Sequence, residues 1–207
     1  MCLNRPVDRT LAEKLNAMFL EMVFAPDYED EACEILKQKE NLRILRDAER
    51  RRWPETDHEF QRVRGGLLVQ DRDEEIEARE HMDVVTQRSP TDAEWEDLMF
   101  AWKVCKHMRS NAIVLARDRA TLGIGAGQMS RVDSVHLGIE KARSHLDRAV
   151  MASDAFFPFP DGPEVAIEAG IGCVIQPGGS RRDPEVIEAC DRAGVAMVFT
   201  SRRHFRH

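Results

Sequence analysis

The stretch that decides the fold is PEVAIEAGIGCVIQPGGSRRDPEVIEACDRAGVAMVFT, residues 163–200. It contains two short helical segments, the first between Pro163 and Gly170 and the second between Pro184 and Gly194. A proline near the start of a helix and a glycine just beyond its end are the usual punctuation of helices. The segments between and after them are apolar and short, as is typical of strands buried on both faces. The stretch therefore predicts parallel strands connected by helices.

The same alternation extends over the rest of the chain. Two sequences, Thr10–Glu13 and Thr91–Glu94, have the Ser/Thr-x-x-Glu pattern of a capping box and predict helix starts. Further helices are expected near Asp30, Arg131, Pro163 and Asp183. Strands are expected at 22–25, 42–45, 66–70, 112–116, 121–124, 150–152, 173–176 and 196–200. We expect an α/β fold with a mostly parallel sheet and helices on both faces, with irregular segments at about 47–62 and 71–90.

Composition excludes several classes of protein. The 207 residues are 43% hydrophobic and carry a net charge of −7, which indicates a globular chain and argues against nucleic acid as the main partner. No apolar run is long enough to cross a membrane, and the N-terminus lacks the apolar stretch of a signal peptide, so we expect a cytoplasmic protein. The five cysteines are scattered, so neither a disulfide framework nor a zinc site is expected.

Three loops stand where a strand leads into a helix, which is the usual place for a ligand in an open α/β sheet. The loop at 123–131 has glycines that would let backbone amides approach an anion, and Arg131 could add a charged contact. A tight strand-to-helix connection is an equally ordinary explanation. A dinucleotide site is a further alternative, with Asp154 as the ribose-binding acid, although the spacing is G-x-G-x-G.

The other two loops leave similar alternatives open. The loop at 153–161 has three phenylalanines, which would either stack on a planar heterocycle bound near Asp161 or plug the end of the sheet. The loop at 176–183 suits an anion, but a plain turn explains it as well. The basic tail at 202–207 is either solvated or holds a phosphate. Lys106 and His107 form an acid/base pair in sequence, but their place on an amphipathic helix indicates a structural role.

These segments, in this order, closely resemble the C-terminal half of the transformylase region in the bifunctional AICAR transformylase/IMP cyclohydrolase family. The resemblance covers the whole of 1–207. It rests on the three loops and on the motifs Leu3–Asp8, Arg64–Asp71, Ser110–Val114 and Arg203–His207. It implies a cytidine deaminase-like fold, no metal, and an active site shared across a homodimer interface.

The resemblance also assigns site residues. Those that match the family's contacts to the AICAR nucleotide are Asn111, Arg131, Phe156 and Arg203, the last as a phosphate ligand. Those on the side that receives the co-substrate 10-formyltetrahydrofolate are Val132, Asp161, Ser180 and Arg181, with a backbone contact expected at Arg181. His207 matches a terminal histidine close to the reaction centre and is the one catalytic candidate.

The activity implied is transfer of a formyl group from 10-formyltetrahydrofolate to the amine of AICAR. In the family a Lys-His pair assists this reaction, and nothing in these 207 residues corresponds to it. The cyclohydrolase domain has no counterpart here either. We therefore expect an incomplete transformylase that works as a homodimer or with the upstream half of the region. The alternatives are a non-catalytic remnant or partial subunit needing a partner chain, and a dinucleotide-binding protein.

Overall fold

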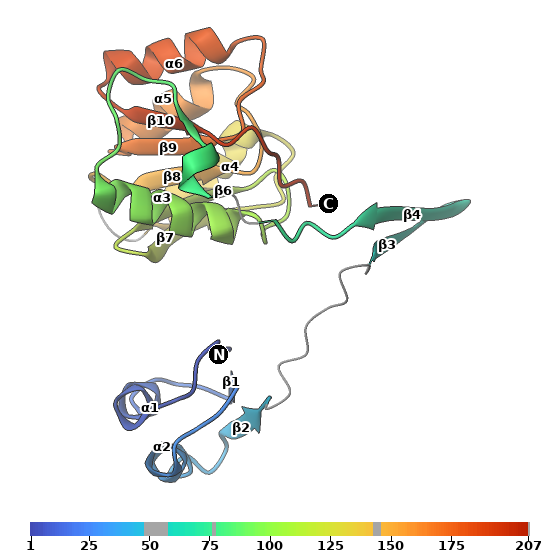
Figure 1. Cartoon of the computed structure of the whole chain (residues 1–207), viewed down its shortest axis with the longest axis vertical. Coiled ribbons are helices and arrows are strands. Elements are labelled where there is room, and N and C mark those ends of the chain that lie inside the picture. Colours follow the sequence, from blue (N-terminus) through green and yellow to red (C-terminus); the bar gives the residue numbers. More distant parts are fainter. Residues whose placement is uncertain (48–57, 76–77, 143–145, 207) are drawn as a thin grey trace. The chain divides into compact units, whose positions relative to one another are not determined.

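A computed structural model describes residues 1–47, 58–75, 78–142 and 146–206. The chain divides into two compact units, Met1–Arg72 and Asp73–His207. Figure 1 shows the elements of both units along the chain.

The first unit contains two helices and two short parallel strands around a small core. Its elements are α1 (Arg9–Asn16), β1 (Met22–Ala25), α2 (Asp30–Leu36) and β2 (Arg43–Arg46), and β1 pairs in parallel with β2. The helix predicted near Thr10 is confirmed, but its cap is not Thr10. Asp8 is the N-cap, and its carboxylate accepts a hydrogen bond from the Leu11 amide. The capping-box pattern misplaced the start because aspartate caps a helix as well as threonine does.

A β-hairpin completes the described part of this unit. Strands β3 (His58–Val63) and β4 (Gly66–Asp71) pair antiparallel, with Phe60 opposite Val69. Residues 58–62 were expected to be irregular, so that part of the prediction is wrong, whereas the strand expected at 66–70 is confirmed. The two apolar residues of β3, Phe60 and Val63, are three positions apart and lie on opposite faces, so the strand has no alternating pattern. Residues 48–57 of the expected irregular segment lie outside the described residues.

The second unit is a six-stranded sheet with helices against it. Its helices are η1 (Arg79–His81), α3 (Asp92–Cys105), α4 (Arg131–Lys141), α5 (Asp161–Glu168) and α6 (Asp183–Arg192). Its strands are β5 (Asp83–Val84), β6 (Ile113–Arg117), β7 (Ala120–Gly125), β8 (Val150–Ser153), β9 (Cys173–Gln176) and β10 (Ala196–Phe199). The strand order is β5-β10-β9-β8-β6-β7.

The sheet is mixed, which corrects the expectation of a mostly parallel one. Strands β8, β9 and β10 run parallel, as the stretch 163–200 predicted. Strands β6 and β7 form a hairpin, and β6 pairs antiparallel with β8. The connection from β6 to β7 is too short for the crossover that a parallel pair requires. Strand β5, in a segment expected to be irregular, pairs antiparallel with the outer side of β10.

Helices cover both faces of this sheet, as predicted. On one face α3 packs through Leu98 and Trp102 against alternate residues of the strands, among them Val114 and Ile175. On the other face α4, α5 and α6 contribute Val135, Ala166 and Val186 to a second cluster. The protein is therefore of the α/β class, and Figure 1 shows the labelled helices around the sheet. Within the part of the chain that the structure describes, no helix combines the length and apolar character needed to cross a membrane.

Candidate functional site

A cavity of about 460 Å³ brings together most of the residues that sequence analysis singled out. Its lining includes six of them, namely Asn111, Arg131, Val132, Phe156, Asp161 and Arg203. The geometry of the sheet explains the convergence. Since β6 runs antiparallel to β8, the start of β6 lies beside the end of β8, with Ile113 opposite Ser153. Three segments therefore meet at one edge of the sheet: the segment before β6, the loop after β8 and the start of α4.

Arg131 lies at the centre of a buried polar network in this cavity. Its Nη1 donates to Ser153 Oγ at 2.8 Å and to the Asp154 carboxylate, and its Nη2 donates to Asn111 Oδ1 at 2.9 Å. Asn111 Nδ2 in turn donates to the Gln128 carbonyl at 3.0 Å. The Arg131 guanidinium thus fixes the orientation of the Asn111 side-chain amide, whose oxygen faces the guanidinium. The arginine and asparagine predicted to contact one ligand are held as a pair.

Asp154 anchors the segments that carry these residues. Its Oδ1 accepts from the Ala112 amide at 3.1 Å as well as from Arg131, and its backbone carbonyl accepts from the His204 amide at 3.0 Å. The side chain is fully buried, and its Oδ2 has no hydrogen-bond partner among the described atoms. Asp154 is therefore not placed to bind a ribose in a dinucleotide, as one alternative required. Its role as the counter-ion of Arg131 was missed by sequence reasoning.

The phenylalanines of the loop after β8 divide between the two roles that the sequence left open. Phe157 is 1% exposed and packs in the core, so it plugs the sheet end. Phe156 and Phe159 line the cavity, and each has a guanidinium 4.7 Å from its ring centroid. Arg203 stacks on Phe156, and Arg182 stacks on Phe159. The wall of the cavity thus combines aromatic faces with positive charge.

The glycines before α4 serve packing between a strand and a helix. A Cβ on Gly123 would lie 2.0 Å from the Gly138 carbonyl oxygen, and a Cβ on Gly125 would lie 1.9 Å from that of Ser134. Only glycine allows β7 and α4 to approach this closely. The tight connection is therefore the correct interpretation of these two positions, and the charged contact from this loop comes from Arg131 alone.

The loop between β9 and α6 is a turn closed by its own carboxylate. The amides of Gly179 and Ser180 donate to Asp183 Oδ2 at 2.7 and 3.1 Å. Two backbone donors of the loop that could bind an anion are thus occupied within it. Ser180 and Arg181 are not among the described residues that line the cavity. The loop still adjoins it, because a Cβ on Gly179 would lie 3.7 Å from Arg203 Nη2.

The basic tail crosses the cavity edge and is fixed by a buried histidine. Arg203 and Phe205 line the cavity, while His204 between them is 1% exposed and packs on the Trp102 ring. His204 Nδ1 lies 2.5 Å from Asp73 Oδ2. Sequence reasoning missed this pairing, since no local pattern connects two residues that are 131 positions apart. His207 lies outside the described residues.

Lys106 and His107 are not a catalytic pair in this structure. The Lys106 side chain is nearly buried and forms an ion pair with Asp73 at 3.3 Å, whereas His107 is exposed. The structural role predicted for them therefore agrees with the geometry. Among the described residues, no cluster of three or more histidine, cysteine or acidic side chains is arranged to hold a metal ion.

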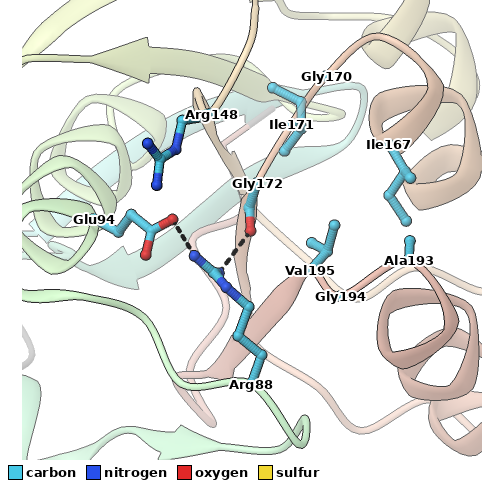
Figure 2. Close-up of a pocket in the computed structure, with 10 residues that line it drawn as sticks. All are labelled: Arg88, Glu94, Arg148, Ile167, Gly170, Ile171, Gly172, Ala193, Gly194 and Val195. Atoms are coloured by element: carbon cyan, nitrogen blue, oxygen red, sulfur yellow. Dashed lines mark hydrogen bonds and ion pairs between the residues drawn. The ribbon is translucent and has the colours of Figure 1, made fainter.

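A second, smaller pocket of about 220 Å³ lies beside the start of β9. Figure 2 shows Arg88 and Glu94 facing each other in it. Arg88 donates to Glu94 Oε1 at 2.5 Å and to the Gly172 carbonyl at 3.0 Å. Burial alone raises the pKa of Glu94, but hydrogen bonds from Thr91 and Arg88 outweigh it and lower that pKa overall. The pair fixes the segment before α3 to the sheet.

The larger cavity is suited to binding and orienting an anionic, planar ligand. The ionisable side chains in its described lining are Arg131, Asp161 and Arg203. Arg131 is compensated by Asp154, so within the described lining the exposed Arg203 guanidinium is the positive charge available to a ligand. Phe156 and Phe159 offer ring surface, and the Asp161 carboxylate in the same lining can accept hydrogen bonds.

Known proteins that are similar to this chain belong to one family. Residues 1–141 match the model of the AICARFT/IMPCHase bienzyme family. The whole chain is 55% identical to a protein of Anaeromyxobacter sp. (strain Fw109-5) and 53% identical to one of Thermoanaerobacter sp. (strain X514), each called bifunctional purine biosynthesis protein PurH. A PurH of Chlorobium luteolum is 51% identical over 99% of the chain. The chain spans 41%, 40% and 39% of these three relatives' lengths.

Proposed function

Because the chain belongs to the AICARFT/IMPCHase bienzyme family, we propose that it forms the C-terminal half of a transformylase region with a cytidine deaminase-like fold. In this proposal it binds the AICAR nucleotide and 10-formyltetrahydrofolate in the 460 Å³ cavity. The reaction joins the nucleotide amine to the formyl carbon, breaks the bond between that carbon and the folate nitrogen, and moves one proton from the amine to the folate.

The observation that carries the proposal is the convergence of Asn111, Arg131, Phe156, Asp161 and Arg203 on one cavity. The resemblance assigns these five residues to one site on sequence alone, and the cavity brings them together. They come from four separate segments of the chain, since Phe156 and Asp161 share the loop at 153–161, so chance proximity is a poor explanation.

Each side chain has a role that suits its surroundings. The exposed Arg203 guanidinium would hold the nucleotide phosphate, because a planar guanidinium binds phosphate oxygens in pairs. Phe156 stacks against that guanidinium and would hold it in place for the nucleotide. Asn111, fixed by Arg131, would orient the carboxamide group. Val132 and Asp161 line the wall at the start of α4 and α5, where the folate would enter, with Ser180 and Arg181 in the adjoining loop.

The proposed chemistry needs a base and a stabiliser for the oxyanion that develops on the formyl group. In the described lining the only candidate base is Asp161, which lies on the folate side. We therefore propose that the Lys-His pair of the family comes from the upstream half of the region, in an active site shared across a homodimer, with His207 as the catalytic candidate of this chain. The cytoplasmic location stays a prediction from the sequence.

Calorimetric titration of the purified chain with the AICAR nucleotide tests the binding part. Saturable binding is expected, and Arg203→Ala should weaken it by about tenfold or more, as for loss of a charge-assisted phosphate contact. Arg192→Ala is the matched control, because Arg192 is an exposed arginine in surface ion pairs on α6. Absence of saturable binding by the unaltered chain would contradict the proposal.

A formyl-transfer assay separates the proposal from its alternatives. Turnover should be low for the chain alone and should rise when a polypeptide carrying the upstream half is added. Full turnover by the chain alone would contradict the shared site. Nucleotide binding with no turnover in any combination would favour a non-catalytic remnant. Saturable binding of a nicotinamide dinucleotide would favour a dinucleotide-binding protein. The burial of Asp154 argues against that alternative.

A further inference from the structure

Arg203 reaches the cavity from a tail that has no helix or strand of its own. An exposed arginine on such a segment would sample many positions, and a binding contact would then have to order it. Arg203 is nevertheless stacked on Phe156, and Phe205, two residues later, also lines the cavity. The residue between them, His204, points the other way into the interior. What holds His204 therefore determines where Arg203 lies.

Three contacts fix His204. Its ring packs on Trp102 of α3, with the two centroids 4.7 Å apart. Its Nδ1 lies 2.5 Å from Asp73 Oδ2, and its amide donates to the Asp154 carbonyl at 3.0 Å. The other Asp73 oxygen forms an ion pair with Lys106 Nζ at 3.3 Å. Asp73 thus joins the end of α3 to the tail.

Neighbouring contacts also hold the tail against the rest of the second unit. Lys106 Nζ also donates to the Glu75 carbonyl, and the Glu75 carboxylate forms an ion pair with Arg202 in the tail. Further along, Arg206 and Ser110 exchange hydrogen bonds, which tie the tail to the residue before Asn111. The residues at 73–75 therefore hold the tail on one side of His204, and Ser110 holds it on the other.

From this arrangement we infer that Asp73, Lys106 and His204 form a tail latch, in which Asp73 is a positioning residue for Arg203. Asp73 does not touch the ligand. It orients the imidazole, the imidazole fixes the tail backbone, and the backbone presents Arg203 to a phosphate ester on the ligand. The inference rests on the proposed function for the identity of that ligand, but the latch itself rests on contacts within the chain.

Asp73→Ala is the informative substitution, because the Asp73 side chain is 39% exposed and its removal leaves no buried cavity. We expect the affinity for the AICAR nucleotide to fall about tenfold, as for loss of one well-placed charged contact. The affinity for the corresponding riboside, which has no phosphate, should stay the same. Glu80→Ala, an exposed acid on η1, is the matched control and should change neither.

A double-variant cycle shows whether Asp73 acts through Arg203. In the Arg203→Ala background, Asp73→Ala should cause no further loss of nucleotide affinity, since the group it positions is gone. Additive losses would overturn the inference. Equal weakening of nucleotide and riboside would also overturn it, because a general distortion of the cavity acts on both.

Hydrogen exchange at the His204 amide tests the latch without any ligand. Exchange should be faster in Asp73→Ala and unchanged in Glu80→Ala. Unchanged exchange in both would overturn the latch, whatever the binding results. If the unaltered chain binds no nucleotide, the proposed function fails, and the exchange measurement alone decides on the latch.

Discussion

At the scale of single residues, the Arg131–Asp154 pair is the most consequential ionic contact of the second unit. Asp154 is fully buried and the Arg131 side chain is 8% exposed. A buried pair contributes little net stability against apolar replacements, but removing one partner leaves the other charge without compensation. The pair thus commits this part of the chain to a single arrangement.

Arg131→Ala should lower the free energy of unfolding by about 3 kcal/mol, because it leaves the Asp154 carboxylate buried without its counter-ion. Urea denaturation measures this. Arg192→Ala removes an arginine that is 64% exposed, and it should cost less than about 1 kcal/mol. An equal loss of unfolding free energy in the two variants would contradict this, because it would show that Asp154 finds another partner or water.

The cysteines give a prediction about pH. Burial raises the pKa of Cys173 and of Cys190 to about 12, and it raises that of Cys105 well above the ordinary value. Cys2 is exposed. Because the thiolate is the reactive form, an alkylating reagent at about pH 8 should label Cys2 in the folded chain and leave these three unlabelled until denaturant is added. Peptide mass spectrometry reads the labelling.

The same thiols should make the fold less stable in alkali. An unfolded cysteine ionises near its ordinary value of 9.0, whereas Cys173 and Cys190 keep their protons up to about pH 12 when folded. The unfolded state therefore holds fewer protons in this window, and the free energy of unfolding falls as the pH rises through it. Rapid labelling of Cys173 in the folded chain would contradict both statements.

At the scale of elements, the contact between β7 and α4 sets the position of Arg131, the first residue of α4. It depends on backbone atoms that meet without side chains between them. Gly125→Ala should lower the free energy of unfolding by about 2 kcal/mol, because its Cβ would overlap the Ser134 carbonyl and push the helix away. Thermal unfolding followed by circular dichroism measures this. The control is Gly66→Ala, where a Cβ would meet nothing within 4 Å.

The elements show what local sequence can predict. The capping box at Thr91–Glu94 has both of its hydrogen bonds, and the apolar strands from β6 to β10 lie where their patterns placed them. Strand β5 has only two residues, which are too few to show the alternation of apolar and polar residues that predicts a strand. The direction of β6 and β7 depends on a two-residue connection, which the alternation of elements does not encode. Asp73 and His204 meet only through the fold, and no local signal could pair them.

At the scale of the whole molecule, the hairpin β3–β4 exposes a group of apolar side chains on one face, beside Arg62. Residues directly opposite in the register share a face, so Phe60, Val69 and Leu67 lie together, and each is more than half exposed. A two-stranded hairpin alone is marginally stable in water. An apolar face of this kind is typical of a surface that associates.

Leu67→Thr combined with Val69→Thr should therefore reduce self-association of the chain in the micromolar range, as read by sedimentation velocity. Threonine keeps the β propensity while it removes apolar surface. Leu68→Thr is the control on the opposite face, where its partner across the hairpin is Gln61. Identical sedimentation of all variants and the unaltered chain would count against the homodimer that we propose.

The short strand β5 has a consequence for the behaviour of the chain at high concentration. It covers the outer side of β10, and the Val85 amide and the Thr86 hydroxyl continue this pairing at Met197. An uncovered β10, with its run of buried apolar residues, would offer a template for cross-β growth. Because only segment 83–86 covers this edge among the described residues, its detachment would expose the backbone of β10 while the rest of the sheet stays folded.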